Sequence, residues 1–360
     1  MRTNFRLAVA AVTFLVFTSQ PVLAQKGNLF NQLVDGSRAE LEKKGGKLKM
    51  ALDWPEEDAK PVLPHFQKAF PFIKQIDYVR ETRSEPFGRY LVSAKQGVYP
   101  EYDIMHVASE FQAQYLKEGL FVKPRFDYKE LNKFLPKEWG KIDDRAIDPK
   151  GYFLGTTGNA RGHAWNPTLV PKGKEPTTWE ACLDPMWKGK VVYDSRGKLE
   201  SLQHDPKTRE RTLKWLRGLR DNNVVLLRGQ ATVLQKVASG EFPIACAVNY
   251  HTTFRMIDQG VKTLAFAFAD PIPLEIGTRL YIPSWSQVPA TTQLFAVWLA
   301  TAGGEFLEKH AYRGFPWDPK SKKYPMAKGK YIALCDAECA EKWEFYEKEH
   351  AELLGIPAAK

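Results

Sequence analysis

The stretch KLKMALDW, residues 47–54, alternates polar and apolar side chains and ends at Asp53 and Trp54. Alternation with a period of two is typical of a β-strand that buries one face. Two more strand-like runs follow, FIKQIDYV at 72–79 and YDIMHV at 102–107, and helical patterns separate the three. The order strand, helix, strand, helix, strand predicts a parallel sheet whose carboxyl ends carry binding loops.

A second set of alternating elements lies further along the chain. GKVVYDSRG at 189–197 and FPIACAV at 242–248 are strand-like, and two helical patterns lie between them. We therefore predict an α/β protein of two lobes, with the ligand bound in a cleft between them. The expected lobe 1 comprises residues 45–120 and 265–310, and the expected lobe 2 comprises residues 121–264 and 311–360 with a C-terminal helix.

The first 24 residues have the pattern of an export signal. Arg2 and Arg6 precede an apolar stretch, and small residues precede Gln25. The apolar stretch is shorter than the ~20 residues that a membrane-spanning helix needs. We expect a signal peptide at residues 1–24, cleavage after Ala24 and a periplasmic location for the mature chain.

The charge of the chain restricts its partners. Lys and Arg number 52 against 42 Asp and Glu, a formal net charge of +10 at pH 7. Basic and acidic residues are interleaved, as in KTRERTLKWLRGLRD at 207–221, which is typical of a solvated surface. With no recognition motif for nucleic acid, we expect none as a partner, and the positive balance favours an anionic solute.

Four cysteines suit an oxidising compartment. Cys335 and Cys339 lie in the short segment CDAEC, which predicts a disulfide between them, and Asp336 is expected to cap the last helix. Cys182 and Cys246 have no evident partner, and Cys246 within IACAV is expected to be a small core residue. Without a CxxC motif, the cysteines are not expected to bind metal.

Catalytic motifs are absent from the sequence. It contains no GxSxG, HExxH, Walker A or GxGxxG pattern. We therefore expect a binding protein with no cofactor and no enzymatic activity.

Candidate ligand-binding residues lie where strands or helices are expected to end. Guanidinium groups and helix N-termini bind anions, tryptophan and tyrosine supply apolar walls, and histidine and amide groups form hydrogen bonds. The candidates are Asp53, Trp54, Arg83, Ser109, Arg161, Arg196, Arg228, Asn249, Tyr250 and His251.

Several segments in order resemble one family. They include YDIMHVASEFQAQYLKEGLF from residue 102, TTWEACLDPMWKGKVVYDSRG from residue 177 and VASGEFPIACAVNYHTTFRMIDQG from residue 237. The chain resembles the extracellular solute-binding proteins of ABC importers, in the iron(III)-binding-like branch of the type II periplasmic binding fold. The resemblance implies a monomer whose two lobes close over a ligand by hinge motion and deliver it to a membrane permease.

The resemblance also suggests roles for site residues. Iron-binding members carry two adjacent tyrosines where this chain has Tyr250 and His251, and phenolates suit Fe(III). Their other ligands, a histidine and a carboxylate, are absent here, where the loops read Asp53-Trp54 and Ala108-Ser109. Some relatives hold a companion anion with an arginine at a position like Arg161.

Three readings of these residues stay open. The first is a small anionic organic solute of the carboxylate or phosphonate type. The second is Fe(III), held by Tyr250 and His251, and in the third these two residues only pack or cap a strand end. A sensory module, which signals to a receptor instead of feeding a permease, is a further alternative.

Overall fold

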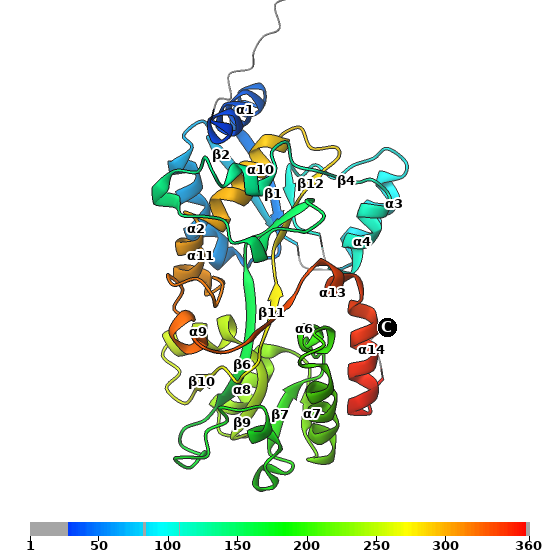
Figure 1. Ribbon diagram of the computed structural model, residues 1–360, viewed down its shortest axis with the longest axis vertical. Helices are drawn as coiled ribbons and strands as arrows, with labels where there is room; N and C mark the ends of the chain where they lie inside the picture. The colour runs from blue at the N-terminus through cyan, green and yellow to red at the C-terminus, as the bar shows by residue number, and fades with distance from the viewer. Residues whose placement is uncertain (1–27, 82–83, 108, 358–360) are drawn as a thin grey trace, which may run out of the picture.

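The computed structural model describes residues 28–81, 84–107 and 109–357. The expected signal peptide at residues 1–24 and the candidate Arg83 lie outside the described residues. Within them, no helix is both long enough and apolar enough to cross a membrane. The chain forms two lobes, stacked along the long axis of the molecule in Figure 1, and the mixed α/β architecture confirms the expected fold class.

The first lobe is built on a three-stranded parallel sheet in the order β2-β1-β3. A second small sheet, antiparallel and in the order β4-β12-β5, packs beside it. The strands of the first lobe are β1 (Lys47–Leu52), β2 (Gln75–Arg80), β3 (Ile104–Met105), β4 (Phe121–Val122), β5 (Phe153–Gly155) and β12 (Arg279–Pro283). Its helices are α1 (Leu29–Lys43), α2 (Glu56–Ala69), α3 (Ser84–Ala94), α4 (Ser109–Lys117), α5 (Tyr128–Leu131), α10 (Pro289–Ala300) and α11 (Gly304–Ala311), with short 3₁₀ turns at Lys137–Trp139 and Asp144–Ala146.

The second lobe is built on one mixed sheet of seven strands. Its order is β13-β11-β6-β9-β7-β8, and β10 also pairs with β6. The strands are β6 (Gly158–Trp165), β7 (Val191–Asp194), β8 (Val225–Leu227), β9 (Ile244–Asn249), β10 (Ala265–Ala267), β11 (Ile272–Ile276) and β13 (Ile332–Cys335). The helices are α6 (Glu200–His204), α7 (Arg209–Asp221), α8 (Gln230–Ala238), α9 (Tyr250–Asp258), α12 (Tyr324–Ala327), α13 (Ala337–Glu341) and α14 (Trp343–Leu354), with 3₁₀ turns at Glu180–Leu183 and Pro185–Trp187.

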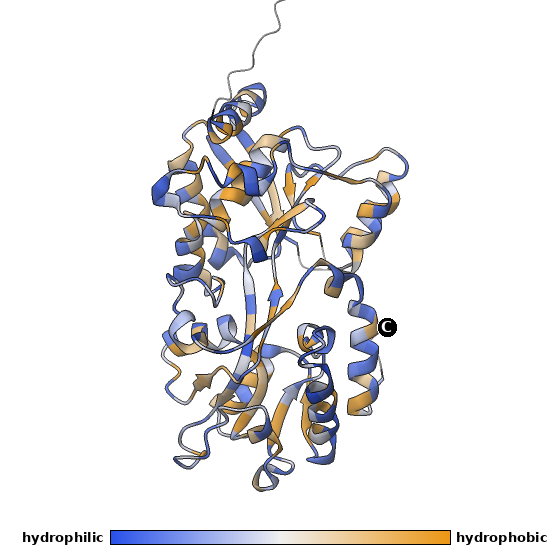
Figure 2. Ribbon diagram, in the orientation of Figure 1, coloured by the Kyte–Doolittle hydropathy of each residue, from blue (hydrophilic) through white to orange (hydrophobic). Residues whose placement is uncertain are grey.

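The core of the first lobe explains the alternating sequence of β1. Lys47 and Lys49 are exposed, while Leu48 and Met50, which alternate with them, are fully buried. They belong to one cluster with Phe66 of α2 and Phe295 and Trp298 of α10, whose rings lie against one another. Figure 2 shows the same division, with hydrophobic colour on the strands and helices of mixed colour around them. Burial of these large side chains is the main stabilising contribution of the lobe.

The packing divides the chain differently from our expectation in two places. Residues 121–155 carry β4 and β5, which pair with β12, and Tyr128 and Leu131 join the core of the first lobe. Residues 265–276 carry β10 and β11, which pair with β6 in the second lobe. The polar composition of residues 124–150 concealed their attachment to the first lobe. We propose lobe boundaries near residues 157 and 277.

The chain crosses between the lobes three times, and two of the crossing segments are bonded to each other. These two run from β5 to β6 and from β11 to β12, and the third runs from α11 to α12. The Thr278 backbone N–H donates to Thr157 Oγ1 at 2.7 Å, and the Thr156 N–H donates to the Thr278 carbonyl at 2.9 Å. These contacts hold the two crossing segments together at the level where the lobes meet.

Candidate functional site

An ion pair joins the lobes beside the crossing segments, and a second arginine lies near the same carboxylate. Asp58, on the first turn of α2, accepts hydrogen bonds from Nη2 of Arg255 on α9 at 2.6 and 2.8 Å. Nε of Arg313, which follows α11, lies 3.5 Å from the same carboxylate, and its Nη1 lies 3.9 Å from Asp53. Charged side chains from both lobes therefore meet outside the carboxyl ends of β1 and β9, where ligands bind in open α/β sheets.

Asp53 follows β1 and is fixed to the crossing segment. It accepts a hydrogen bond from Thr278 Oγ1 at 3.0 Å. Burial alone would raise the pKa of Asp53, but the positive charges of His106 and Arg313 and the Thr278 bond hold it below its usual value. Asp53 is therefore an anion on the first-lobe side of the site, with the guanidinium group of Arg313 3.9 Å away.

Trp54 does not offer a surface to a ligand in this structure, in contrast to our expectation. Its side chain is fully buried in the first-lobe core, and its Nε1–H donates to Thr278 Oγ1 at 2.8 Å. A large apolar ring next to the core gains more from burial than from a solvated site wall. Trp54 therefore anchors the crossing segment.

His251 lies in the first turn of α9, surrounded by positive charge. Burial lowers the pKa of His251 well below its usual value, and the charges of Arg313, Lys323, Arg255 and Arg161 lower it further. The imidazole is therefore neutral, and Nδ1 has no hydrogen-bond partner among the described residues. A neutral imidazole within a set of cations is suited to hydrogen bonding with an anion that these cations attract.

Tyr250 precedes His251 but points into the core. It is 1% exposed, and its ring stacks on Phe254 at 4.2 Å and on Phe268 at 5.7 Å between centroids. The Nζ of Lys323 lies 4.5 Å from the Tyr250 ring centroid, and burial raises the pKa of the phenol above its usual value. The Tyr250 hydroxyl is therefore protonated at neutral pH.

Arg161 is a buried cation on β6, directly opposite Asn249 of β9. It is 5% exposed, and its Nη1 has no hydrogen-bond partner within residues 28–81, 84–107 and 109–357. Its charge lowers the pKa values of His251 and His350. Because a buried guanidinium group needs a partner, Arg161 is an attractive position for an anionic group.

Asn249 links this cluster to the adjacent loops of the second lobe. Its N–H donates to Gln230 Oε1 at 2.9 Å, while the Asn249 Oδ1 atom is buried without a partner in the described part of the chain. The Gln230 amide in turn donates to Asp194 at 3.0 Å. Asn249 therefore presents a fixed acceptor beside Arg161.

The other candidates lie outside this cluster. Arg196 is half exposed and forms a two-point pair with Asp194, with bonds of 3.1 and 2.8 Å, so its charge is already compensated. Arg228 is exposed at the end of β8. Ser109 is the first residue of α4, and its side chain is outside the description.

Sequence reasoning missed several residues that the fold brings to the site. Asp58 sits in the acidic first turn of α2, and Arg255 lies one helical turn after His251, a spacing that places both on the same helix face. His106 ends the run IMH after β3. Arg313 and Lys323 come from the C-terminal return of the chain, where Arg313 follows the end of α11 and Lys323 directly precedes α12.

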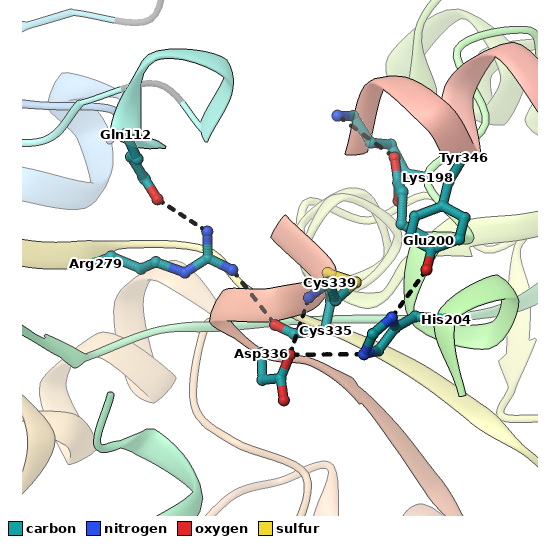
Figure 3. Close-up of a disulfide and its surroundings, with 9 residues drawn as sticks. All are labelled: Gln112, Lys198, Glu200, His204, Arg279, Cys335, Asp336, Cys339 and Tyr346. Carbon is teal, nitrogen blue, oxygen red and sulfur yellow. Dashed lines mark hydrogen bonds and ion pairs between the residues drawn. A yellow bond between two sulfur atoms is a disulfide. The ribbon is translucent and has the colours of Figure 1, made fainter. Parts of the chain in front are cut away.

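Both disulfides are closed. Cys335 and Cys339, with Cα atoms 5.1 Å apart, join the end of β13 to α13, and Asp336 accepts from the Cys339 N–H at 3.0 Å (Figure 3). Cys182 and Cys246 are also bonded, over a separation of 64 residues, although the sequence suggested no partner for either.

Among the described residues, one group of side chains is spaced closely enough to hold a metal ion, namely His163, Cys182 and Cys246. Its two sulfurs are bonded to each other, which removes the thiolates that a metal would need. His163 Nδ1 accepts from the Ala247 N–H at 3.2 Å, and burial lowers the pKa of His163 to about 3. The group is therefore structural.

Residues 100–270 match the family model described as bacterial extracellular solute-binding protein. This segment of 171 residues is similar to that family. The matched residues include β9 and the start of α9, where the cationic cluster lies. No curated protein matches the chain in sequence.

Solved structures of solute-binding proteins share the fold. Iron-bound HitA from Pseudomonas aeruginosa has a TM-score of 0.63 at 14% identity, over 85% of this chain and 99% of that one. The substrate-binding protein of the ABC transporter from Agrobacterium tumefaciens has a TM-score of 0.64 at 12% identity, over 86% of this chain and 94% of that one. The ferric binding protein from Campylobacter jejuni has a TM-score of 0.64 at 16% identity, over 85% of this chain and 99% of that one. The chain therefore has the type II periplasmic binding fold.

Proposed function

We propose that this protein captures a small anionic organic solute, of the carboxylate or phosphonate type, between its two lobes and delivers it to the permease of an ABC importer. The solute-binding family and the likeness to the transporter protein of Agrobacterium support the role in import. The ligand class rests on the chemistry of the site.

The charges of the site favour an anion. Three guanidinium groups, those of Arg161, Arg255 and Arg313, lie around His251, and the carboxylates of Asp53 and Asp58 compensate two of them. Lys323 is neutralised by Glu308, whose carboxylate lies 2.9 Å from its Nζ. One positive charge therefore remains for a ligand.

The observation that carries the proposal is the buried guanidinium group of Arg161. Its unpartnered Nη1, the Nδ1 atom of His251 and the Oδ1 atom of Asn249 are all buried polar atoms without partners in the described chain. Buried polar atoms are normally hydrogen-bonded, so a set of three around the end of β9 supports a ligand that bonds to them. A carboxylate or phosphonate group can accept from Arg161, and a hydroxyl elsewhere on the ligand can donate to His251 or Asn249.

Fe(III) is the second reading, because proteins of the same fold are described as ferric binding proteins. Two features argue against it. The Tyr250 ring is buried and stacks on Phe254 and Phe268, and His251 lies among four cations that repel a trivalent metal. We therefore favour the organic anion.

Native mass spectrometry of the protein purified from its own compartment tests the proposal. We expect a bound compound of small mass that carries a carboxylate or phosphonate, and calorimetry on that compound then gives its affinity. A protein that retains iron, with a tyrosinate charge-transfer band that disappears in Tyr250→Phe, would overturn the organic ligand. Accumulation of labelled compound by cells, lost on deletion of the gene, distinguishes import from sensing.

A further inference from the structure

Residues 335–342, here called the C-terminal clasp, leave the second lobe and return to it within a few residues. The clasp begins at Cys335, the last residue of β13, which pairs with Glu275 of β11 in the second-lobe sheet. It ends where α14 begins, and α14 packs on α6 and α7 of the same lobe. Both ends of the clasp are therefore fixed to the second lobe, while α13 lies between them.

The clasp touches the first lobe at three points. Arg279, the first residue of β12, donates from Nη2 to the Cys335 carbonyl at 3.3 Å and from Nη1 to Gln112 Oε1 of α4 at 3.1 Å. Lys150 Nζ lies 2.5 Å from Glu341 Oε1 at the other end of α13. Between these points α13 packs along α4, and a small pocket remains between the two helices.

The clasp is equally attached to the second lobe. Asp336 Oδ1 lies 3.9 Å from Nε2 of His204 on α6, and Nδ1 of the same histidine lies 2.9 Å from the Tyr346 hydroxyl of α14. Figure 3 shows this chain of contacts, from Gln112 through Arg279 to the disulfide and on to His204 and Tyr346.

The disulfide makes the clasp rigid. α13 has five residues, and an isolated helix of that length does not persist in water. The bond between Cys335 and Cys339 joins this helix to β13, and the Asp336 side chain caps it through the Cys339 N–H at 3.0 Å. α13 therefore moves with the second lobe and not as an independent loop.

The clasp lies on the opposite side of the crossing strands from the Asp58–Arg255 pair. In Figure 1, α9 and α13 flank the crossing strands on the left and the right. Lobe opening about these strands must separate at least one of the two contacts. We propose that the C-terminal clasp is a disulfide-stiffened stop that docks on α4 when the lobes are closed and releases it when they open. This inference does not depend on the nature of the ligand.

The test compares the full chain with its Cys335→Ala/Cys339→Ala variant, without added ligand, by hydrogen exchange and small-angle X-ray scattering. We expect exchange to rise about tenfold or more in residues 337–341 and to rise also in α4, and we expect a larger radius of gyration. α14 should keep its wild-type exchange. Faster exchange in 337–341 alone, with α4 and the radius unchanged, would overturn the proposal.

A pair of milder variants covers the case in which loss of the disulfide prevents folding. Lys150→Ala/Glu341→Ala removes the exposed ion pair that reaches the first lobe, and Glu338→Ala/Lys342→Ala removes an equally exposed pair within the clasp, 2.7 Å long. We expect α4 exchange to rise about two- to fivefold in the first variant and to stay at the wild-type rate in the second. Equal hydrogen-exchange rates of α4 in the two variants would refute the proposal that the clasp acts as a stop.

Discussion

Asp58 and Arg255 lie 197 residues apart in the chain, and the arginine donates to both oxygens of the carboxylate, at 2.6 and 2.8 Å. One residue is on α2 of the first lobe and the other on α9 of the second. Asp58 is 1% exposed, so the pair is screened from water on the carboxylate side. This contact joins the two lobes on the side of the crossing segments where α2 and α9 meet.

Removal of the Asp58 charge should loosen the lobes. In Asp58→Asn, Arg255 and Arg313 lose their shared counterion, and we expect a loss of about 1–3 kcal/mol in the free energy of unfolding and a larger radius of gyration. Urea denaturation and X-ray scattering measure the two effects. Glu57→Gln is the matched control, because Glu57 is exposed and lies 3.9 Å from Arg255, and its loss should cost under about 0.5 kcal/mol. Equal effects in both variants would contradict the role of Asp58.

Arg161 should carry much of the affinity for the ligand. Truncation in Arg161→Ala removes a buried guanidinium group from an anion, and we expect a drop in affinity of tens to thousands of times, about 2–5 kcal/mol. Arg161→Lys should recover part of it, since a lysine keeps the charge but not the planar fork. Arg89→Ala, which removes an exposed arginine of α3, should bind like wild type. Calorimetry with the copurified compound measures these affinities. Unchanged affinity in Arg161→Ala would show that the anionic group does not bind at Arg161.

The Thr278 hydroxyl should stabilise the junction of the lobes. It accepts from Trp54 Nε1 and from Thr157 Oγ1, and it donates to Asp53. In Thr278→Val these buried groups lose a partner, so we expect a loss of about 2–4 kcal/mol in unfolding free energy. Thr278→Ser keeps the hydroxyl and should lose much less. Thermal unfolding of the two variants makes the comparison, and similar losses would point to the methyl group instead.

Acid should destabilise the protein through its buried histidines. Burial lowers the pKa of His163 to about 3 and that of His350 to about 4, whereas an unfolded histidine titrates near 6.5. Their stability contribution is present above pH ~6.5 and declines as the pH falls toward the folded values, because only the unfolded chain then takes up the proton. We expect each histidine to cost about 2 kcal/mol at pH 5 relative to pH 7. The urea concentration at the midpoint of unfolding, measured between pH 7 and pH 5, tests this expectation. In His350→Phe this midpoint should fall less steeply with decreasing pH than in the wild type.

The regular elements and the local disulfide could be predicted from the sequence. The burial of Leu48 and Met50 follows the alternation in KLKMALDW. Cys335 and Cys339 are close in sequence, and their contact needs no knowledge of the fold. Cys182 and Cys246 meet only because β9 brings Cys246 into the second-lobe core, and no local pattern reports that.

The site was predictable only in part, because it is assembled from distant segments. Arg161 is at a strand position that the resemblance singled out, and the structure places it beside His251. Arg255 and Asp58 become site residues only when the two lobes approach, and Arg313 arrives from the C-terminal return. Tyr250 has the right position along the chain, but the aromatic cluster of Phe254 and Phe268 turns it inward.

The crossing segments also bear on the order in which the protein can acquire structure. The sheets of the first lobe need β12, and its core needs α10, both of which follow the whole sequence from β6 to β11. While the chain is being synthesised, the first 157 residues lack the partners that complete their core. The core of the N-terminal lobe therefore stays incomplete until β12 and α10 have been synthesised, and a chain truncated before residue 279 would leave β4 and β5 without the strand that pairs with both.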